Sequence, residues 1–361
     1  MTSSSHADSD HEGWLPPCSH MVLLTEGSST PFLAKTAISL LRYRGEDVVA
    51  VLDSENCGAT AQQLFGTGGD IPVIASLDEV PEADSLVIGI APPGGKVPHD
   101  WRPILFDAIR RNMDIVSSLH DFLSDDPELI EIAAYQNVRI VDVRRNNERD
   151  TSDCITFRPE CLRIHTVGND CSLGKMVTTL EMQRELSKRG FRAGFAATGQ
   201  TGIMISGAGV PIDSVVADFV NGAAERLVQR MQNFDYLLIE GQGSIVHPRY
   251  SGVSLGLLHG CAPDGLILCY EVGREFIKGL DHIPITPFKK LIGLHEEIAS
   301  CRHPCKVIGI SMNSRLLDDA AADLERERVR KELGLPICDV YRHGPGELVD
   351  AAIKLKGELN S

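Results

Sequence analysis

The sequence predicts an α/β protein with two domains, each built around a mostly parallel sheet with helices on its faces. Two observations support this fold class. Short apolar runs alternate with stretches of helical spacing along most of the chain, and this alternation is typical of parallel strands joined by crossover helices. The length of 361 residues exceeds the usual size of one domain and favours two.

The first half of the chain has the strand and helix pattern of one such domain. Its apolar runs predict strands at 21–25, 48–53, 85–91, 115–118 and 138–143. The segments between these runs have helical spacing, which predicts helices at 31–43, 101–112 and 127–135.

The second half repeats the pattern. Its apolar runs predict strands at 163–167, 192–197, 236–240, 266–271, 307–312 and 337–341. Helical spacing predicts helices at 175–189, 214–232, 287–299, 318–333 and 346–357.

A charged stretch separates the two halves. Residues 144–153 read RRNNERDTSD and interrupt the apolar pattern, as a domain boundary does. Residues 1–19 are rich in Ser, His and Asp and show no apolar period, which predicts a disordered tail. We therefore expect domains at 20–150 and 151–361.

Composition excludes several classes of protein. The 35 basic and 50 acidic side chains give a net charge of −15, so a nucleic-acid partner is not expected. No apolar run approaches the length that spans a bilayer, and no export signal is visible, so we expect a cytoplasmic protein without a membrane partner. Ten irregularly spaced cysteines fit reduced thiols, and no metal site is predicted. Apolar helices such as 214–232 favour a homodimer.

The clearest functional signal is a glycine-framed loop, Val167-Gly-Asn-Asp-Cys-Ser-Leu-Gly-Lys175, between an expected strand and an expected helix. Glycines allow the turn to point its amide groups inward, and the helix N-terminus adds a partial positive charge. Lys175 adds a mobile cation. The loop and first helical turn are therefore expected to bind a phosphorylated ligand through Gly168, Asn169, Asp170, Cys171, Ser172, Leu173, Gly174, Lys175, Met176 and Val177.

The spacing of this loop departs from the common form. Five residues separate Gly168 from Gly174, which resembles dethiobiotin synthetase and its relatives among the P-loop proteins. Those proteins carry Ser or Thr after the lysine as a magnesium ligand, whereas Met176 stands here. Thr178 and Thr179 lie further into the helix and are poor substitutes. Phosphate binding is therefore favoured over magnesium-ATP chemistry.

Further candidate site residues follow other expected strands. Glu240 ends one strand and precedes Gly-Gln-Gly, which resembles the E-G-x-G segment of the dethiobiotin synthetase group. A carboxylate at this edge of a parallel sheet suits catalysis, and a capping role is the alternative. Side chains expected to contact the substrate are Gln200, Thr201, Gln242, Ser244, Arg249, Tyr250 and Ser251.

His247 lies in the loop that follows Glu240 and is a candidate general base, because an imidazole titrates near neutral pH. Glu240 is the other candidate base, and Lys175 completes the expected catalytic set. A hydrogen-bonded structural histidine is the alternative interpretation of His247.

The first domain lacks the G-x-G-x-x-G dinucleotide motif. Its loops, including Ala91-Pro-Pro-Gly-Gly95, are similar to the CoA-binding domain of succinyl-CoA synthetase. A Rossmann-like domain with a nucleotide ligand other than NAD is therefore expected, although Asp53 after the second strand could still contact a ribose.

Residues from about 21 to 355 resemble one family, DUF1611, which is associated with D-glutamate N-acetyltransferase. The matching segments are Lys35-Thr-Ala37, Arg42-Tyr43, Asp53-Ser54, Gly168–Lys175, Gly199-Gln-Thr-Gly202, Glu240-Gly-Gln-Gly-Ser244, His247-Pro248 and Tyr250-Ser-Gly252. The resemblance implies a Rossmann-like domain followed by a P-loop NTPase-like domain, and acetyl transfer from acetyl-CoA to an amino acid.

Three functions remain open at this point. In acyl transfer, the loop and Lys175 would hold the phosphates of acetyl-CoA, and His247 or Glu240 would act as the base. Backbone amides near Gly241–Ser244 would stabilise the oxyanion. Arg249 would bind the carboxylates of the substrate. In ATP-dependent carboxylate activation, Glu240 and Asp170 would hold Mg²⁺. The third possibility is a non-catalytic nucleotide-binding regulator.

Overall fold

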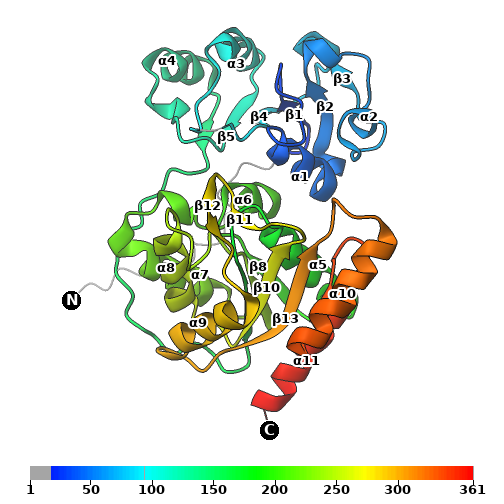
Figure 1. Cartoon of the computed structure of the whole chain (residues 1–361). Coiled ribbons are helices and arrows are strands. Elements are labelled where there is room, and N and C mark those ends of the chain that lie inside the picture. The colour runs from blue at the N-terminus through cyan, green and yellow to red at the C-terminus, as the bar shows by residue number, and fades with distance from the viewer. Residues whose placement is uncertain (1–17, 93, 361) are drawn as a thin grey trace, which may run out of the picture. The chain divides into compact units, whose positions relative to one another are not determined.

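The structure, a computed structural model, describes residues 18–92 and 94–360 and divides the chain into two compact units (Figure 1). The first unit comprises the chain up to Arg145 together with the later segment Gln200–Gly209. The second unit comprises Asn146–Gly199 and the chain from Val210 onward. Most of the tail predicted at 1–19 lies outside the described residues. Cys18 is buried, and its carbonyl accepts a hydrogen bond from Arg44 at 2.9 Å.

The first unit contains a parallel sheet in the order β3-β2-β1-β4-β5-β6. This order is the one found in doubly wound dinucleotide-binding folds, so the Rossmann-like prediction is confirmed. The strands are β1 (Met21–Leu24), β2 (Val48–Leu52), β3 (Val73–Ile74), β4 (Ser85–Ile88), β5 (Asp114–Ser117) and β6 (Ile140–Asp142). The helices are α1 (Lys35–Tyr43), α2 (Ala61–Phe65), α3 (Arg102–Arg110) and α4 (Pro127–Gln136).

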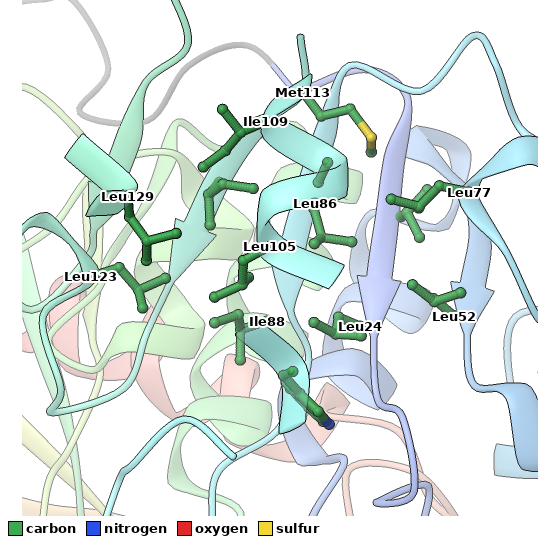
Figure 2. Close-up of a cluster of buried hydrophobic side chains, with 14 of the residues drawn as sticks. Leu24, Leu52, Leu77, Leu86, Ile88, Leu105, Ile109, Met113, Leu123 and Leu129 are labelled. Atoms are coloured by element: carbon green, nitrogen blue, oxygen red, sulfur yellow. The ribbon is translucent and has the colours of Figure 1, made fainter. Parts of the chain in front are cut away.

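The core of the first unit forms where α3 and α4 pack on this sheet. Figure 2 shows Leu105 and Ile109 of α3 among strand residues that include Leu24 and Ile88. Trp101, 1% exposed, lies in the same cluster and donates its indole N–H to the carbonyl of Glu26 at 3.2 Å. Burial of such large apolar side chains is the main stabilising contribution to the unit.

Asp53 directly follows β2, where an acid in a dinucleotide-binding fold would contact a ribose. Here its buried carboxylate accepts hydrogen bonds from the Ser29 hydroxyl, the Asn56 amide at 2.8 Å and the Glu55 backbone at 3.2 Å. These bonds join the loops that follow β1 and β2. The arrangement fits a structural role for Asp53 better than the ribose contact considered from the sequence.

The second unit contains a parallel sheet in the order β14-β13-β10-β7-β9-β8. Its strands are β7 (Leu162–Gly168), β8 (Ala193–Ala196), β9 (Tyr236–Ile239), β10 (Gly265–Glu271), β13 (Lys306–Asn313) and β14 (Ile337–Cys338). Its helices are α5 (Lys175–Lys188), α7 (Val220–Met231), α8 (Ser251–Cys261), α9 (Phe288–Ser300), α10 (Asp319–Leu333) and α11 (Gly346–Leu359). The predicted α/β class is therefore confirmed in both halves of the chain.

Six elements were not predicted from the sequence: β3, α2, α6 (Gln200–Ser206), α8 and the two strands of an antiparallel hairpin, β11 (Phe276–Ile277) and β12 (Leu280–Pro284). Helix α8 is glycine-rich, which lowers its helix propensity. Two of its glycines allow close packing on α7. A Cβ on Gly256 would lie 2.3 Å from Val220, and one on Gly260 would lie 2.4 Å from the Asn221 carbonyl.

Among residues 18–92 and 94–360, no helix combines the length and apolar character needed to cross a bilayer.

Candidate functional site

The glycine-framed loop connects β7 to α5 at the carboxyl edge of the second sheet. Ser172 (φ 55°) and Gly174 (φ 103°) adopt left-handed backbone angles that turn the chain into the helix. Gly174 is the N-cap and no side chain of the described residues caps this end, so the amides of the first turn are available to an anion.

Gly168 was predicted to allow the turn of the loop, but in the structure it allows close packing instead. It lies within β7 and does not adopt a left-handed angle. A Cβ at this position would lie 2.7 Å from the Leu173 side chain and 3.1 Å from the Cys269 carbonyl. Glycine is therefore required by close packing of the loop against β10, and the unusual backbone angle comes from Ser172 and Gly174.

Lys175 reaches back across the loop. Its side chain is buried, and its ammonium donates to the Asp170 carbonyl at 2.8 Å. Within the described part of the chain, no carboxylate pairs directly with this ammonium. Burial lowers the pKa of Lys175, because the charged form has lost its hydration. An anionic ligand in the loop would supply the missing counter-charge.

Asp170 connects the loop to the segment after β10. Its fully buried carboxylate accepts from the backbone of Cys171 at 2.6 Å, the backbone of Lys278 at 2.8 Å and the guanidinium of Arg274 at 2.8 Å. Arg274 also donates to the Cys171 carbonyl at 2.8 Å and to Glu271 at 3.0 Å. Nothing in the sequence motif indicated Arg274 or Lys278, which lie about a hundred residues further along the chain.

Asp170, Cys171 and His247 place potential metal-ligand atoms within 4.8 Å of one another. The hydrogen bonds do not fit a metal. The Arg249 backbone N–H donates to His247 Nδ1 at 3.1 Å, which places the proton of the neutral ring on Nε2. Nε2 faces Asp170 at 3.5 Å, so it presents a proton rather than a lone pair. Asp170 is already paired with Arg274.

The same contacts of the His247 ring argue against its predicted role as general base. The ring is 1% exposed, and burial lowers its pKa, which favours the neutral form. With Nδ1 accepting from Arg249 and Nε2 directed at Asp170, neither nitrogen offers a free lone pair to a substrate. This geometry favours a positioning role for His247 and leaves Glu240 as the stronger candidate base.

Glu240 directly follows β9 and is 4% exposed. Its Oε2 accepts from the backbone N–H groups of Thr198 and Gly199, both at 2.9 Å. Burial raises the pKa of Glu240 to about 7, and these two bonds only partly offset the effect. A base with such a pKa is half-ionised near neutral pH, which suits proton transfer.

Gln242 lies beside this carboxylate. A Cβ on Gly199 would lie 2.5 Å from the Gln242 amide and 3.0 Å from Glu240 Oε1, so both side chains converge over Gly199. The Gln242 amide also donates to the Thr198 hydroxyl at 3.3 Å. The role of Thr198 and Gly199 in holding Glu240 was not predicted.

The threonines of α5 do not replace the missing magnesium ligand. The Thr178 hydroxyl lies 2.7 Å from the Ser311 hydroxyl, and the Thr179 hydroxyl donates to the Lys175 carbonyl at 2.8 Å. Both side chains are buried in the interior of the unit. Met176, at the position of the usual hydroxyl, cannot bind the ion. The residues around the loop therefore do not fit the magnesium site that ATP chemistry requires.

The remaining predicted site residues are divided between the two units. Ser244, Arg249, Tyr250 and Ser251 lie in the second unit with Gln242, on the segment that leads into α8. The Tyr250 ring is half-exposed and lies 4.7 Å from the His247 ring. Arg249 is exposed, and its guanidinium makes no ion pair with a described residue.

Gln200 and Thr201 begin α6 in the first unit, where the Thr201 hydroxyl lies 3.4 Å from that of Thr36. Their predicted contact with substrate remains a prediction.

A separate cavity of about 830 Å³ lies in the second unit and includes Arg163, Arg302 and Phe157 in its lining. Arg163 pairs with Asp264 at 2.8 Å, and Arg302 pairs with Glu225. Glu225 also accepts from the backbone of Asp153 at 2.8 Å. Because these charges neutralise one another and hold the linker after Arg145, the cavity has a structural explanation and is distinct from the loop.

Gly241 offers a test of the packing beneath the site. Its N–H donates to the Thr166 hydroxyl at 3.0 Å, and a Cβ would lie 1.7 Å from the Thr166 carbonyl oxygen. We expect Gly241→Ala to lower the free energy of unfolding by about 3 kcal/mol, because β7 and β9 must separate. Urea denaturation measures the change. Gly293→Ala, in an open position of α9, should be neutral or stabilising by up to about 1 kcal/mol. Equal effects of the two substitutions would contradict this packing.

Comparison with known proteins agrees with both domains. Residues 150–349 match a family model described as "Domain of unknown function (DUF1611_C) P-loop domain". Residues 54–146 match "Domain of unknown function (DUF1611_N) Rossmann-like domain". The chain belongs to the DUF1611 family. The family predicted from the sequence is thereby confirmed.

Two curated relatives of this DUF1611 protein carry the same name, "D-glutamate N-acetyltransferase". The one from Tritonibacter scottomollicae is 38% identical over 332 residues, which is 91% of this chain and 97% of the relative. The one from a Pseudoalteromonas species is 36% identical over 329 residues, with the same coverage.

A solved structure is similar over nearly the whole chain. The crystal structure of a DUF1611 family protein from Anabaena variabilis is 36% identical, has a TM-score of 0.87, and covers 93% of this chain and 99% of its own.

Proposed function

We propose that this DUF1611 protein is an N-acetyltransferase that transfers the acetyl group of acetyl-CoA to the amine of D-glutamate. The name shared by relatives over almost their whole length supports this class of activity. The structural observation that carries the proposal is the position of Glu240, a buried carboxylate with a pKa near 7, directly after β9, the strand that pairs with β7 ahead of the glycine-framed loop. An acetyl transfer of this kind needs a base and a phosphorylated carrier, and it needs no magnesium.

In this proposal the loop holds a phosphate group of acetyl-CoA. The N-terminal amides of α5 and the ammonium of Lys175 supply the attraction, and Asp170 with Arg274 fixes the shape of the loop. The flexible pantetheine arm of acetyl-CoA carries the thioester away from the phosphates. The carrier therefore needs to be anchored at one end only.

Glu240 accepts a proton from the amine of the acceptor, and the freed lone pair attacks the thioester carbonyl. The carbon–sulfur bond then breaks, CoA leaves as a thiolate, and the thiolate takes up a proton. In the Gly241–Ser244 segment the Gly241 N–H is already bonded to the Thr166 hydroxyl, so the backbone N–H groups of Gln242, Gly243 and Ser244 would stabilise the oxyanion of the tetrahedral intermediate. Arg249, whose guanidinium is exposed, would bind a carboxylate of the amino acid.

A thiol-release assay tests the proposal. Purified protein with acetyl-CoA and D-glutamate should release one CoA for each N-acetyl-D-glutamate detected by mass spectrometry. Adding MgATP and measuring ADP in parallel tests the ligase alternative. Absence of CoA release together with magnesium-dependent ADP formation would overturn the proposal.

A further inference from the structure

Asn169 is a buried polar residue whose side chain makes no hydrogen bond to a described residue. It follows Gly168 at the end of β7 and is 3% exposed. Its Oδ1 is fully buried and accepts no hydrogen bond from a described residue. The Ser118 hydroxyl of the first unit is the other buried side-chain atom in this condition among the described residues. Such an atom costs stability, and proteins retain it mainly where function requires it.

The neighbourhood of Asn169 connects the loop with the candidate base. Strands β7 and β9 pair in parallel as far as His165 and Ile239, and beyond this pair Gly241 bonds to the Thr166 hydroxyl. Asn169 and Glu240 therefore follow neighbouring strands at the same edge of the sheet. The acid next to Asn169, Asp170, is already occupied by Arg274 and two backbone amides.

The chemistry of the unpartnered atom indicates what it binds. A carbonyl oxygen accepts a hydrogen bond, and an ionised phosphate ester has no N–H or O–H to donate. The amine of an amino acid does. No described residue donates a hydrogen bond to this oxygen, so it can accept one from a ligand.

We propose that Asn169 positions the acceptor amine: its side-chain oxygen accepts one amine N–H while Glu240 removes a proton from the same nitrogen. Loss of this proton frees the lone pair of the nitrogen, and the contact with Asn169 orients it toward the thioester carbonyl. This inference rests on the proposed acetyl transfer and goes beyond it, because it assigns the first residue after β7 to the acceptor amino acid instead of the carrier.

Two substitutions separate an amine contact from a phosphate contact. Asn169→Leu removes both polar ends of the amide and should raise the KM for D-glutamate about 10- to 100-fold, with the KM for acetyl-CoA nearly unchanged. Asn169→Asp keeps an acceptor oxygen and adds a negative charge. It should leave the KM for D-glutamate unchanged or lower it, whereas a carboxylate that touched a phosphate would raise the KM for acetyl-CoA.

Thermal unfolding of the ligand-free protein gives a readout that does not depend on activity. Asn169→Leu should unfold at the same temperature as wild type or higher, because it replaces an unpartnered buried amide. Ser118→Ala removes the other unpartnered buried atom among the described residues, the Ser118 hydroxyl of the first unit. This variant should also unfold at the wild-type temperature or higher, and it should leave both KM values unchanged.

The inference is overturned if Asn169→Leu retains the wild-type KM for D-glutamate, or if Asn169→Asp raises the KM for acetyl-CoA instead. A fall in unfolding temperature with both KM values unchanged would identify Asn169 as structural and would also overturn it. Wild-type protein that releases no CoA would instead reject the proposed acetyl transfer, so the two failures are distinguishable.

Discussion

Lys175→Met should lower kcat/KM for acetyl-CoA by about 100-fold or more, since a desolvated cation that contacts a phosphate contributes about 3 kcal/mol or more. The methionine keeps most of the apolar volume of the lysine stem, so the loop should retain its packing. The affinity for CoA, measured by isothermal titration calorimetry, should fall with the activity.

The same substitution should not weaken the empty fold. Burial disfavours the charged form of Lys175 and lowers its pKa, so the ammonium reduces stability at neutral pH. Removing it should leave the free energy of unfolding unchanged or raise it. Lys289→Met, on the exposed surface of α9, is the matched control and should change neither stability nor affinity. Wild-type CoA affinity in Lys175→Met would show that the ammonium does not hold the ligand.

Glu240→Gln should lower kcat by about 100- to 10,000-fold, the range associated with loss of a general base. The amide oxygen can still accept from Thr198 and Gly199, so the loop geometry should persist. The wild-type rate should rise with pH through about 7, as Glu240 loses its proton. The variant should lose this rise. A pH–rate profile from 5.5 to 9 checks both statements.

The free energy of unfolding should change with pH in the opposite direction to the rate, because of the same carboxyl group of Glu240. Its pKa rises from 4.5 in the unfolded chain to about 7 in the folded protein. The folded protein therefore binds more protons between these pH values, and the free energy of unfolding falls as pH rises through the window. Above pH 7 the cost reaches about 3 kcal/mol. Glu240→Gln should remove this cost and so raise the free energy of unfolding above pH 7, and it should leave the free energy of unfolding unchanged near pH 4.5.

Glu297→Gln, on the exposed side of α9, is the control for the change from carboxylate to amide and should leave the rate profile and stability unchanged. A Glu240→Gln variant that keeps the wild-type rate and pH profile would show that another group removes the proton. This result would make His247 the stronger candidate for the base.

The sequence was sufficient for the parts of the fold that depend on local pattern. Apolar runs in β7, β9 and β10 and the helical spacing of α5 predicted both the parallel sheet and the position of the loop. Helix α8 could not be predicted, because its glycines disfavour an isolated helix and are explained only by contact with α7. Strand β3 and the β11–β12 hairpin are too short to show a period.

The candidate site was predictable only where neighbouring residues form it. Gly174 and Lys175 follow from the loop motif, and Glu240 follows from its place after a strand. Arg274 could not be found, because only the folded sheet brings the end of β10 to Asp170. The engagement of both His247 nitrogens depends likewise on the backbone of Arg249 and on Asp170, which no spacing reveals.

Calorimetric titration of the wild-type protein with CoA and with pantetheine, which lacks the phosphates, tests the central claim most directly. The account predicts saturable binding of CoA, and binding of pantetheine at least about 100-fold weaker, because the loop and Lys175 contact only the phosphorylated part. Equal affinity for the two compounds, or no binding of CoA, would contradict the account.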